Sequence, residues 1–238
     1  MTDAVKTLKE WTDAAHKIVF FGGAGVSTES GIPDFRSTGG LYHQEWSYPP
    51  ETILSHTFYK SNPEEFFRFY RAKMLCPEAK PNAAHKKLAQ WEQEGRLLAV
   101  VTQNIDGLHQ AAGSRNVYEL HGSVHRNHCE RCGKFYSLDH ILHTTGVPRC
   151  ACGGIIKPDV VLYEEALNEQ VMDGAVQAIA AADMLIIGGT SLNVWPAAGL
   201  INYFRGEHLV LINKSAVARD LTADLVITDP IGEVLDQL

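Results

Sequence analysis

A glycine-rich turn followed by an acid, an aromatic ring and a guanidinium is the first feature of this sequence that suggests chemistry. The apolar run Ile18–Phe21 breaks into glycines at positions 22, 23 and 25, as a strand does before a phosphate-binding turn. Glycines let backbone N–H groups approach a phosphate closely, because no Cβ stands between them. Asp34, Phe35 and Arg36 follow on a proline-marked loop, where they can pair with phosphates and stack on rings. The pattern indicates a dinucleotide site, and the absence of G-K-[ST] argues against a nucleoside-triphosphate P-loop.

A second group of polar residues follows the apolar run 97–101. Gln103 and Asn104 are adjacent amides at the carboxyl end of an expected strand, and their donors and acceptors suit ribose hydroxyls. Asp106 comes two residues later. An Asp after a strand often only caps the next helix, so a capping role and a binding role for Asp106 both stay open.

His121 is the candidate general base. It leaves the short apolar stretch 117–120, just before a cysteine-rich segment. A single histidine is more often structural, but beside such polar groups a neutral imidazole near pH 7 can activate a hydroxyl. His85 and His109 compete for this role, although both fall on expected helices, where they can simply be partly buried.

Four of the five cysteines form two close pairs, Cys129-x-x-Cys132 and Cys150-x-Cys152, with 17 residues between the pairs. Such spacing presents two thiolates from each loop to one tetrahedral ion and therefore predicts a zinc site. Four thiolates fill the coordination sphere, so the metal would be structural rather than catalytic. The narrow C-x-C pair and several nearby histidines leave a ligand exchange open, although we expect those histidines at the surface; they are His125, His128, His140 and His143.

The elements that must position these groups alternate between strand and helix patterns. Several of the expected strands are continuous apolar runs, which is typical of strands covered on both faces, so we expect a parallel sheet in an α/β fold. Ligands of such sheets bind at the carboxyl ends of the strands. The expected strands are 17–21, 97–102, 117–120, 183–188, 208–213 and 224–228, and helical patterns occupy 3–15, 81–94 and 167–181.

Length, charge and composition exclude several classes of protein. The 238 residues suit one domain with a small insertion, and 45% hydrophobic with 21% charged residues is an ordinary globular balance. The net charge of −7 argues against a general nucleic-acid or anionic-membrane binder. No apolar run reaches the ~18–20 residues that span a bilayer, and the N-terminal residues lack the apolar segment of a signal peptide. We therefore expect a cytoplasmic protein whose cysteines do not form disulfides.

Taken together, the motifs resemble those of the sirtuins, the NAD-dependent protein lysine deacylases, and of the bacterial members in particular. They follow the order of that family and span nearly the whole chain. The matching segments are Gly23–Arg36, Thr102–Asp106, Glu119–Gly122, the two cysteine pairs, Lys157–Val161 and Gly188–Leu192.

The resemblance implies a Rossmann-like parallel sheet with a small inserted zinc-binding module, and a cleft between them for NAD and substrate. The large lobe would comprise about 1–35, 80–121 and 160–238. The small lobe would comprise a cofactor loop and helical part, about 36–79, and the zinc module, about 122–159.

The resemblance also implies roles for individual residues. His121 would be the general base, and Asn104 would order the ribose or a water. Peptide would pair with the edge formed by Val160, Val161, Leu162 and Tyr163, and Gly189–Val194, including Leu192, would flank it on the other side. NAD would contact Ala24, Thr28, Phe35, Arg36, Gln103, Ile105, Asp106, Thr190, Ser191, Asn213 and Ile231.

The implied reaction removes an acetyl group from lysine and gives nicotinamide, O-acetyl-ADP-ribose and free lysine, with acetyl-lysine proteins as partners and no nucleic acid or membrane. Sirtuins that prefer succinyl or malonyl groups carry a Tyr-x-x-Arg pair in one helix. Here Arg71 matches the arginine, whereas Arg68 replaces the tyrosine, so we expect acetyl groups to be preferred and acidic acyl groups to react weakly.

Two alternatives remain. Mono-ADP-ribosylation of a protein would use the same pocket with another nucleophile, and only the product distinguishes it from deacylation. A non-catalytic NAD or ADP-ribose sensor has no evident need to keep His121 and Asn104 together. Neither the substrate protein nor the oligomeric state follows from the sequence.

Overall fold

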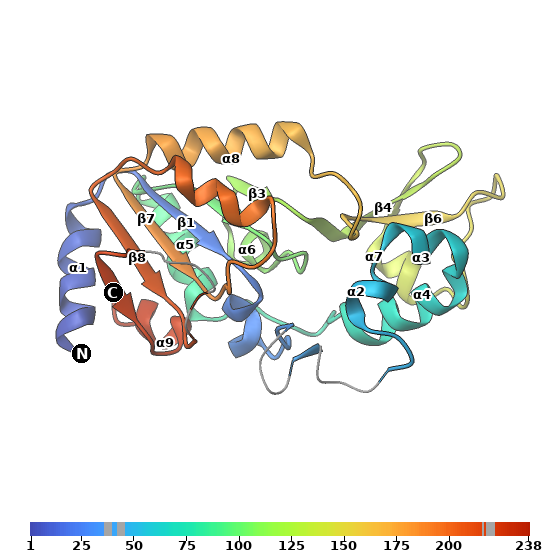
Figure 1. Ribbon diagram of the computed structural model, residues 1–238, viewed down its shortest axis with the longest axis horizontal. Coiled ribbons are helices and arrows are strands. Elements are labelled where there is room, and N and C mark those ends of the chain that lie inside the picture. Colours follow the sequence, from blue (N-terminus) through green and yellow to red (C-terminus); the bar gives the residue numbers. More distant parts are fainter. Residues whose placement is uncertain (36–39, 42–45, 216, 218–221) are drawn as a thin grey trace.

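A six-stranded parallel sheet forms the larger part of the molecule in the computed structural model, which describes residues 1–35, 40–41, 46–215, 217 and 222–238 (Figure 1). Its strand order is β3-β2-β1-β7-β8-β9, and every neighbouring pair is parallel. The expected α/β architecture and all of its expected strands are thereby confirmed. The strands are β1 Ile18–Gly22, β2 Leu97–Thr102, β3 Val117–Glu119, β7 Met184–Gly188, β8 His208–Ile212 and β9 Leu225–Ile227.

Two hydrophobic cores cover the two faces of this sheet. Along β1, Ile18 and Phe20 point into the core shared with helices α1, α5 and α9, whereas Val19 and Phe21 point into the core shared with α8 and the 3-10 helix η4. Burial on both faces explains why the strands read as continuous apolar runs. The covering helices are α1 Asp3–Ala14, α5 Ala83–Gln93, α6 Leu108–Ala112, α8 Glu169–Ala181, η4 Ala197–Tyr203 and α9 Ile231–Leu235.

The order of the strands reverses beside β1. The chain passes from β1 to β2 and β3 on one side and returns through β7 to β8 and β9 on the other. A crevice opens where neighbouring connections leave a parallel sheet in opposite directions, and ligands bind there. In this chain that point lies at the carboxyl ends of β1 and β7, where Gly22 pairs with Gly188.

The remaining elements form a smaller body at the other end of the molecule (Figure 1). Its antiparallel sheet has the order β5-β4-β6 and belongs to the cysteine-rich segment, as expected. Short helices pack beside it and share one hydrophobic core with it, which includes Cys129 and Cys150. These elements are α2 Pro50–Ile53, α3 His56–Ser61, α4 Pro63–Phe69, the π-helix η3 Tyr70–Met74, β4 Gly122–Cys129, β5 Phe135–Ser137, α7 Leu138–Leu142 and β6 Ile156–Val160.

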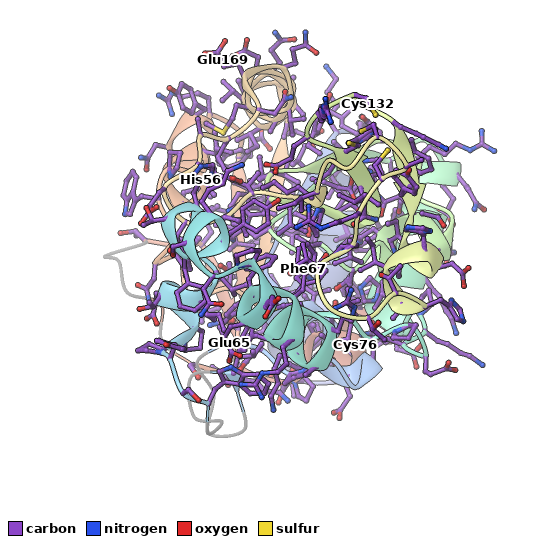
Figure 2. All side chains as sticks on the ribbon, turned by 90° about the vertical axis from the view of Figure 1, so that its right-hand side faces the viewer. His56, Glu65, Phe67, Cys76, Cys132 and Glu169 are labelled. Atoms are coloured by element: carbon purple, nitrogen blue, oxygen red, sulfur yellow. The ribbon has the colours of Figure 1, made fainter. Side chains whose placement is uncertain are left out.

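Aromatic side chains fill the helical part of this smaller body. Figure 2 views it end-on, with Phe67 near the middle of the face and His56 and Cys132 toward its opposite sides. Phe66 and Phe67 pack edge to face at 5.2 Å, and Tyr59 and Tyr70 adjoin them. Such rings bury large apolar areas, which compensates for the shortness of the helices. Within the described residues, no helix combines the length and the apolar character needed to cross a membrane.

Candidate functional site

The carboxyl ends of β1 and β7 form a glycine cradle. The Gly25 N–H donates to the Gly189 carbonyl at 2.8 Å, and a Cβ on Gly25 would lie 2.8 Å from Gly189 Cα. Gly189 itself has a φ of 58°, a left-handed conformation that glycine adopts without strain. Gly25 belongs to the first turn of the 3-10 helix η1, Ala24–Ser30, which also carries Ala24 and Thr28 into the cavity wall.

The loop after β2 is held against η1 by polar contacts. Ser27 Oγ donates to Asp106 Oδ2 at 2.7 Å and accepts from Asn104 Nδ2 at 3.1 Å. The other Asp106 oxygen accepts from Leu108 N at 2.9 Å, at the start of α6. The structure thus supports the capping role of Asp106, since one oxygen accepts the first N–H of α6 while the other fixes the loop, and the binding role stays a prediction. Asn104 is only 8% exposed, so its amide has a defined orientation at the site.

His121 lies beside this loop. Its Nδ1 is 2.9 Å from the Gln103 carbonyl oxygen, which can only accept, so Nδ1 carries the proton and Nε2 keeps its lone pair. Burial lowers the pKa of His121 below its usual range, and the bond to the Gln103 carbonyl opposes that shift in part. The imidazole is thus neutral at pH 7 and is a competent proton acceptor.

One cavity of about 910 Å³ brings nearly all of the expected site residues together. Its wall includes the cradle, the Gln103–Asp106 loop, His121 and the edge Val160–Tyr163, whose Val161 N–H donates to the His121 carbonyl at 3.0 Å. Gln103 Nε2 also donates to Thr190 Oγ1 at 3.0 Å, which joins the β2 and β7 sides of the crevice. The expected residues in the wall are Ala24, Thr28, Phe35, Gln103, Asn104, Ile105, Asp106, His121, Val160, Val161, Leu162, Tyr163, Thr190, Ser191, Asn213 and Ile231.

Two expected residues are not among the lining residues. Arg36 lies outside the described residues. Leu192 is 1% exposed and packs in the core that the sheet shares with α8, although its backbone has a φ of 55° next to the cavity residue Ser191.

The two competing histidines lie behind the cavity. His85 on α5 and His109 on α6 are 0% and 1% exposed, and their rings lie 4.7 Å apart. Burial lowers the pKa of His85 to about 4 and that of His109 to about 3. Three of their four ring nitrogens have no hydrogen-bond partner among the described residues. Neither histidine is among the cavity-lining residues, so they do not compete with His121.

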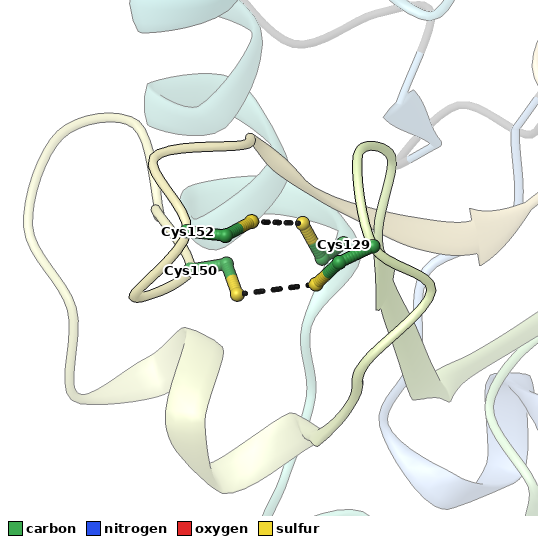
Figure 3. Close-up of side chains that lie close together, drawn as sticks. Cys129, Cys150 and Cys152 are labelled. Atoms are coloured by element: carbon green, nitrogen blue, oxygen red, sulfur yellow. Dashed lines mark hydrogen bonds between the residues drawn. The ribbon is translucent and has the colours of Figure 1, made fainter.

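The four paired cysteines converge on one point (Figure 3). Their sulfur atoms all lie within 4.8 Å of one another, with Cys129 and Cys152 at 3.4 Å and Cys132 and Cys150 at 3.6 Å. A tetrahedral zinc with bonds of about 2.3 Å places its sulfurs ~3.8 Å apart, so the donor set fits this ion. Gly133 and Gly153, with φ values of 71° and 86°, make the tight turns that the two loops require.

The two neighbouring histidines on β4 have other partners. His125 Nε2 lies 2.9 Å from the Asp106 carbonyl, and His128 Nδ1 lies 2.8 Å from Asp159 Oδ1. The predicted all-cysteine structural site is therefore supported over a ligand exchange. No cysteine of the cluster lines the cavity, so this metal has no direct access to the reacting groups.

Sequence reasoning missed several residues of the site. Ser27 lies inside the glycine motif, but its partner Asp106 is 79 residues away, and no local signal connects them. Glu164 and Glu165 line the cavity directly after the predicted peptide edge. In the sequence, two acidic residues at this place suggest only an exposed surface. Trp195 also lines the cavity although it is 62% exposed, and no local signal in the sequence marks it.

Comparisons with known proteins agree with this geometry. The model of the Sir2 family matches residues 23–196. A Clostridium acetobutylicum protein named NAD-dependent protein deacetylase is 60% identical over 240 residues, covering 99% of this chain and 98% of that protein. A solved Sir2 structure with a p53 peptide and NAD+ has a TM-score of 0.86 at 38% identity, covering 100% of this chain and 97% of the other.

A further Sir2 structure, with a deacetylated p53 peptide and 3'-O-acetyl ADP ribose, has a TM-score of 0.89 at 37% identity and covers 97% of this chain and 95% of the other. These matches extend over the sheet, the glycine cradle and the cysteine module alike. They confirm the resemblance seen in the motifs, and the chain belongs to the Sir2 family, the sirtuins.

Proposed function

We propose that this chain removes acetyl groups from lysine side chains of proteins or peptides in an NAD-dependent reaction. The observation that carries the proposal is the single cavity whose wall holds the glycine cradle, the Gln103–Asp106 loop, His121 and the edge Val160–Tyr163. The deacetylase name of a relative 60% identical to this chain supports the same reaction. Bound NAD would supply the ribose carbon that the acyl oxygen attacks as nicotinamide leaves, and one water is consumed in the later release of free lysine and O-acetyl-ADP-ribose.

The residues of the large sheet bind the dinucleotide. Gly23 and Gly25 let the chain after β1 pack closely against Thr190 and Gly189, which a Cβ on either glycine would meet at 2.8 Å, and this packing shapes the crevice where the phosphates belong. Ala24, Thr28 and Phe35 line this side, with Thr190, Ser191, Asn213 and Ile231 toward the adenosine half. Asp106, fixed by Ser27, holds the nicotinamide end together with Gln103 and Ile105. Arg36 stays in this set as a prediction.

His121 acts as the general base. Its Nδ1 proton is held by the Gln103 carbonyl, so Nε2 can accept a proton from a ribose hydroxyl, which then attacks the acylated centre. Asn104, 8% exposed and oriented by Ser27, orders the ribose or a water in the same cavity. Apolar walls keep bulk water away from the developing positive charge.

The acyl-lysine substrate binds at the junction of the two lobes. The residue ranges of the two lobes stay as predicted from the sequence. The edge Val160–Tyr163 lines the acyl tunnel and pairs with the peptide backbone, and the segment Gly189–Val194 flanks it on the other side through Gly189, Thr190, Ser191 and Val194, with Leu192 packed beneath them. The partners are therefore acetyl-lysine proteins, with no nucleic acid or membrane required, and we place the reaction in the cytoplasm.

The first experiment incubates the purified chain with NAD and an acetyl-lysine peptide and identifies the products by mass spectrometry. Deacetylation predicts a peptide lighter by one acetyl group, with one nicotinamide and one O-acetyl-ADP-ribose for each peptide converted. ADP-ribose attached to protein would instead support the transferase alternative. Unchanged NAD with a range of acyl peptides would support the sensor and refute the proposal.

A further inference from the structure

An acidic side chain behind the peptide edge has no role in the reaction described above. Glu165 directly follows the edge and its carboxylate is 20% exposed. Oε2 accepts from Leu162 N at 2.9 Å and from Lys157 Nζ at 3.1 Å, and Oε1 lies 2.9 Å from His56 Nδ1. Burial raises the pKa of this carboxyl, but the hydrogen bonds from His56 and Leu162 outweigh it and keep the pKa below its usual range.

Lys157 extends this network along the edge. Its ammonium donates to the Val160 carbonyl at 3.1 Å and to the Pro158 carbonyl at 3.3 Å, besides pairing with Glu165. The Glu165 N–H also donates to the Leu162 carbonyl at 3.1 Å. The carboxylate and the ammonium together hold the backbone of the edge at Val160 and at Leu162.

The same edge is tied to the helical part of the small lobe. Tyr163 forms a parallel bridge with Ser55, in which His56 N donates to the Tyr163 carbonyl and Tyr163 N donates to the Leu54 carbonyl, both at 3.0 Å. Glu164 follows with a φ of 76°, an uncommon conformation for a residue other than glycine. Its carboxylate accepts from Thr57 N and Thr57 Oγ1 at 2.9 and 2.7 Å.

We propose that Glu165 is a positioning residue for the acyl-lysine peptide, because it holds the edge Val160–Tyr163 in the geometry that receives the peptide and anchors that edge to α3 through His56. This inference rests on the proposed function of the same cavity. The hydrogen-bond partners of the Glu165 carboxylate are His56, Lys157 and Leu162, which belong neither to the glycine cradle nor to the Gln103–Asp106 loop. Its loss therefore weakens peptide binding and leaves NAD binding unchanged, since a loosened edge must be ordered again by the peptide.

The test is steady-state kinetics of the full chain with E165Q, which keeps the size of the side chain but removes its charge. We expect KM for an acetyl-lysine peptide to rise about tenfold, with KM for NAD within about twofold of wild type. K60Q is the matched control. Lys60 lies on α3, as His56 does, but its ion pair at 2.6 Å is with Glu130 and not with the edge. An unchanged peptide KM in folded E165Q would overturn the proposal, as would an equal rise in both KM values.

Two further variants keep the test decisive if E165Q folds poorly. H56Q alters one contact at a side chain that is 44% exposed, and it should raise the peptide KM about threefold. K157M should raise it as well, and in combination with H56Q the effect should stay below the product of the single effects, because both residues act through the Glu165 carboxylate. Wild-type peptide KM in both single variants would refute the role.

Peptide affinity measured directly separates this inference from the proposed function. Fluorescence anisotropy of a labelled acetyl-lysine peptide needs no turnover. If wild type binds the peptide without deacetylating it and E165Q binds it about tenfold more weakly, the positioning role stands and the proposed function fails. Equal affinity of wild type and E165Q refutes the positioning role, whatever the turnover.

Discussion

At the scale of single residues, the direction of two protons decides the chemistry. The Gln103 carbonyl fixes the proton of His121 on Nδ1, and Ser27 turns its hydroxyl proton toward Asp106. The first contact leaves Nε2 of His121 as an acceptor, and the second leaves the Ser27 oxygen to accept from Asn104 Nδ2. All four residues belong to the sequence motifs or directly follow from them, but only these contacts orient the base and the loop.

Substitution of His121 by alanine should abolish turnover while NAD still binds, because the cradle and the Gln103–Asp106 loop remain. We expect a decrease in kcat of at least about a hundredfold. H143A is the control, since the His143 side chain, directly after α7, is 77% exposed. Calorimetric titration with NAD and peptide turnover measure the two properties, and a fully active H121A protein would exclude His121 as the base.

The lowered pKa of His121 predicts how the activity changes with pH. Because burial shifts its pKa below 6.5, the imidazole stays neutral at pH 7 and through the range just below it. Activity should therefore be flat from about pH 8 to 7 and should fall only at more acidic pH, as Nε2 becomes protonated. A profile of kcat/KM against pH tests this, and a loss of activity already between pH 8 and 7 would contradict it.

Acid should also destabilise the fold through His85 and His109. Their pKa values are lowered to about 4 and about 3, so between those values and 6.5 the unfolded chain binds protons that the folded chain does not. Stability is thus fully present above about pH 7, falls as the pH drops through 6.5 and levels off near the folded values. We expect a loss of roughly 2 to 4 kcal/mol in the free energy of unfolding between pH 7 and pH 5.

Urea unfolding at the two pH values measures this loss. H109F is the informative variant, because it replaces one buried imidazole by an apolar ring beside Phe20. The pH dependence should decrease by about half in H109F, since one of the two titrating groups is gone. An identical pH dependence in wild type and H109F would show that other groups cause it.

At the scale of elements, the segment α4–η3 determines what its arginines can do. Arg68 bonds Glu65 through Nε at 2.7 Å and lies 4.5 Å over the Trp46 ring. Arg71 donates to the Ile141 and Gly146 carbonyls at 3.0 and 2.7 Å, on and after α7. Neither arginine is among the residues that line the cavity. Their guanidinium groups stabilise the small lobe instead of facing an acyl chain.

This orientation supports the expected preference for acetyl over acidic acyl groups. With matched peptides, kcat/KM for acetyl-lysine should exceed that for succinyl-lysine by at least about tenfold, because no described guanidinium pairs with the succinyl carboxylate in the tunnel. R71A should lower the thermal midpoint and leave this ratio unchanged. A ratio below one in wild type, or a ratio that changes in R71A, would refute the interpretation.

At the scale of the whole molecule, three hydrophobic cores stabilise different parts of the fold. Two of them lie on the faces of the large sheet, and the third joins the cysteine module to the aromatic helices. Because β4 begins at Gly122, directly after His121, the base stands where the two bodies meet. The zinc module is therefore connected to the chemistry through the backbone, although its cysteines do not reach the cavity.

Removal of zinc should consequently unfold the small lobe before the large sheet. C129S with C132S, or a strong chelator, should abolish deacetylation and expose the small lobe to proteolysis, since metal binding energy is folding energy in such modules. Circular dichroism during heating should then show two transitions instead of one. A metal-free protein, verified by elemental analysis, that stays active and protease-resistant would contradict a structural role for zinc.

Much of the fold and site could be predicted because the relevant signals are local. The strand 97–102 was predicted with its observed bounds, since a run of apolar residues between turns needs only its own neighbours. The zinc ligands could be predicted for the same reason, because the two cysteines of each pair lie on one short loop. Other features could not be predicted from the sequence. An example is the burial of Leu192, whose neighbours Thr190 and Ser191 line the cavity.

By itself, the sequence determined the strands, the glycine turn, the zinc ligands and the family, because each is encoded by residues close together in the chain. Only the tertiary structure decided that Ser27 fixes Asp106 across 79 residues and that Glu165 meets His56 across 109. Tertiary packing likewise turned both arginines of α4–η3 away from the cavity. Contacts over such separations depend on how the two bodies pack, and no local pattern of residue types records that packing.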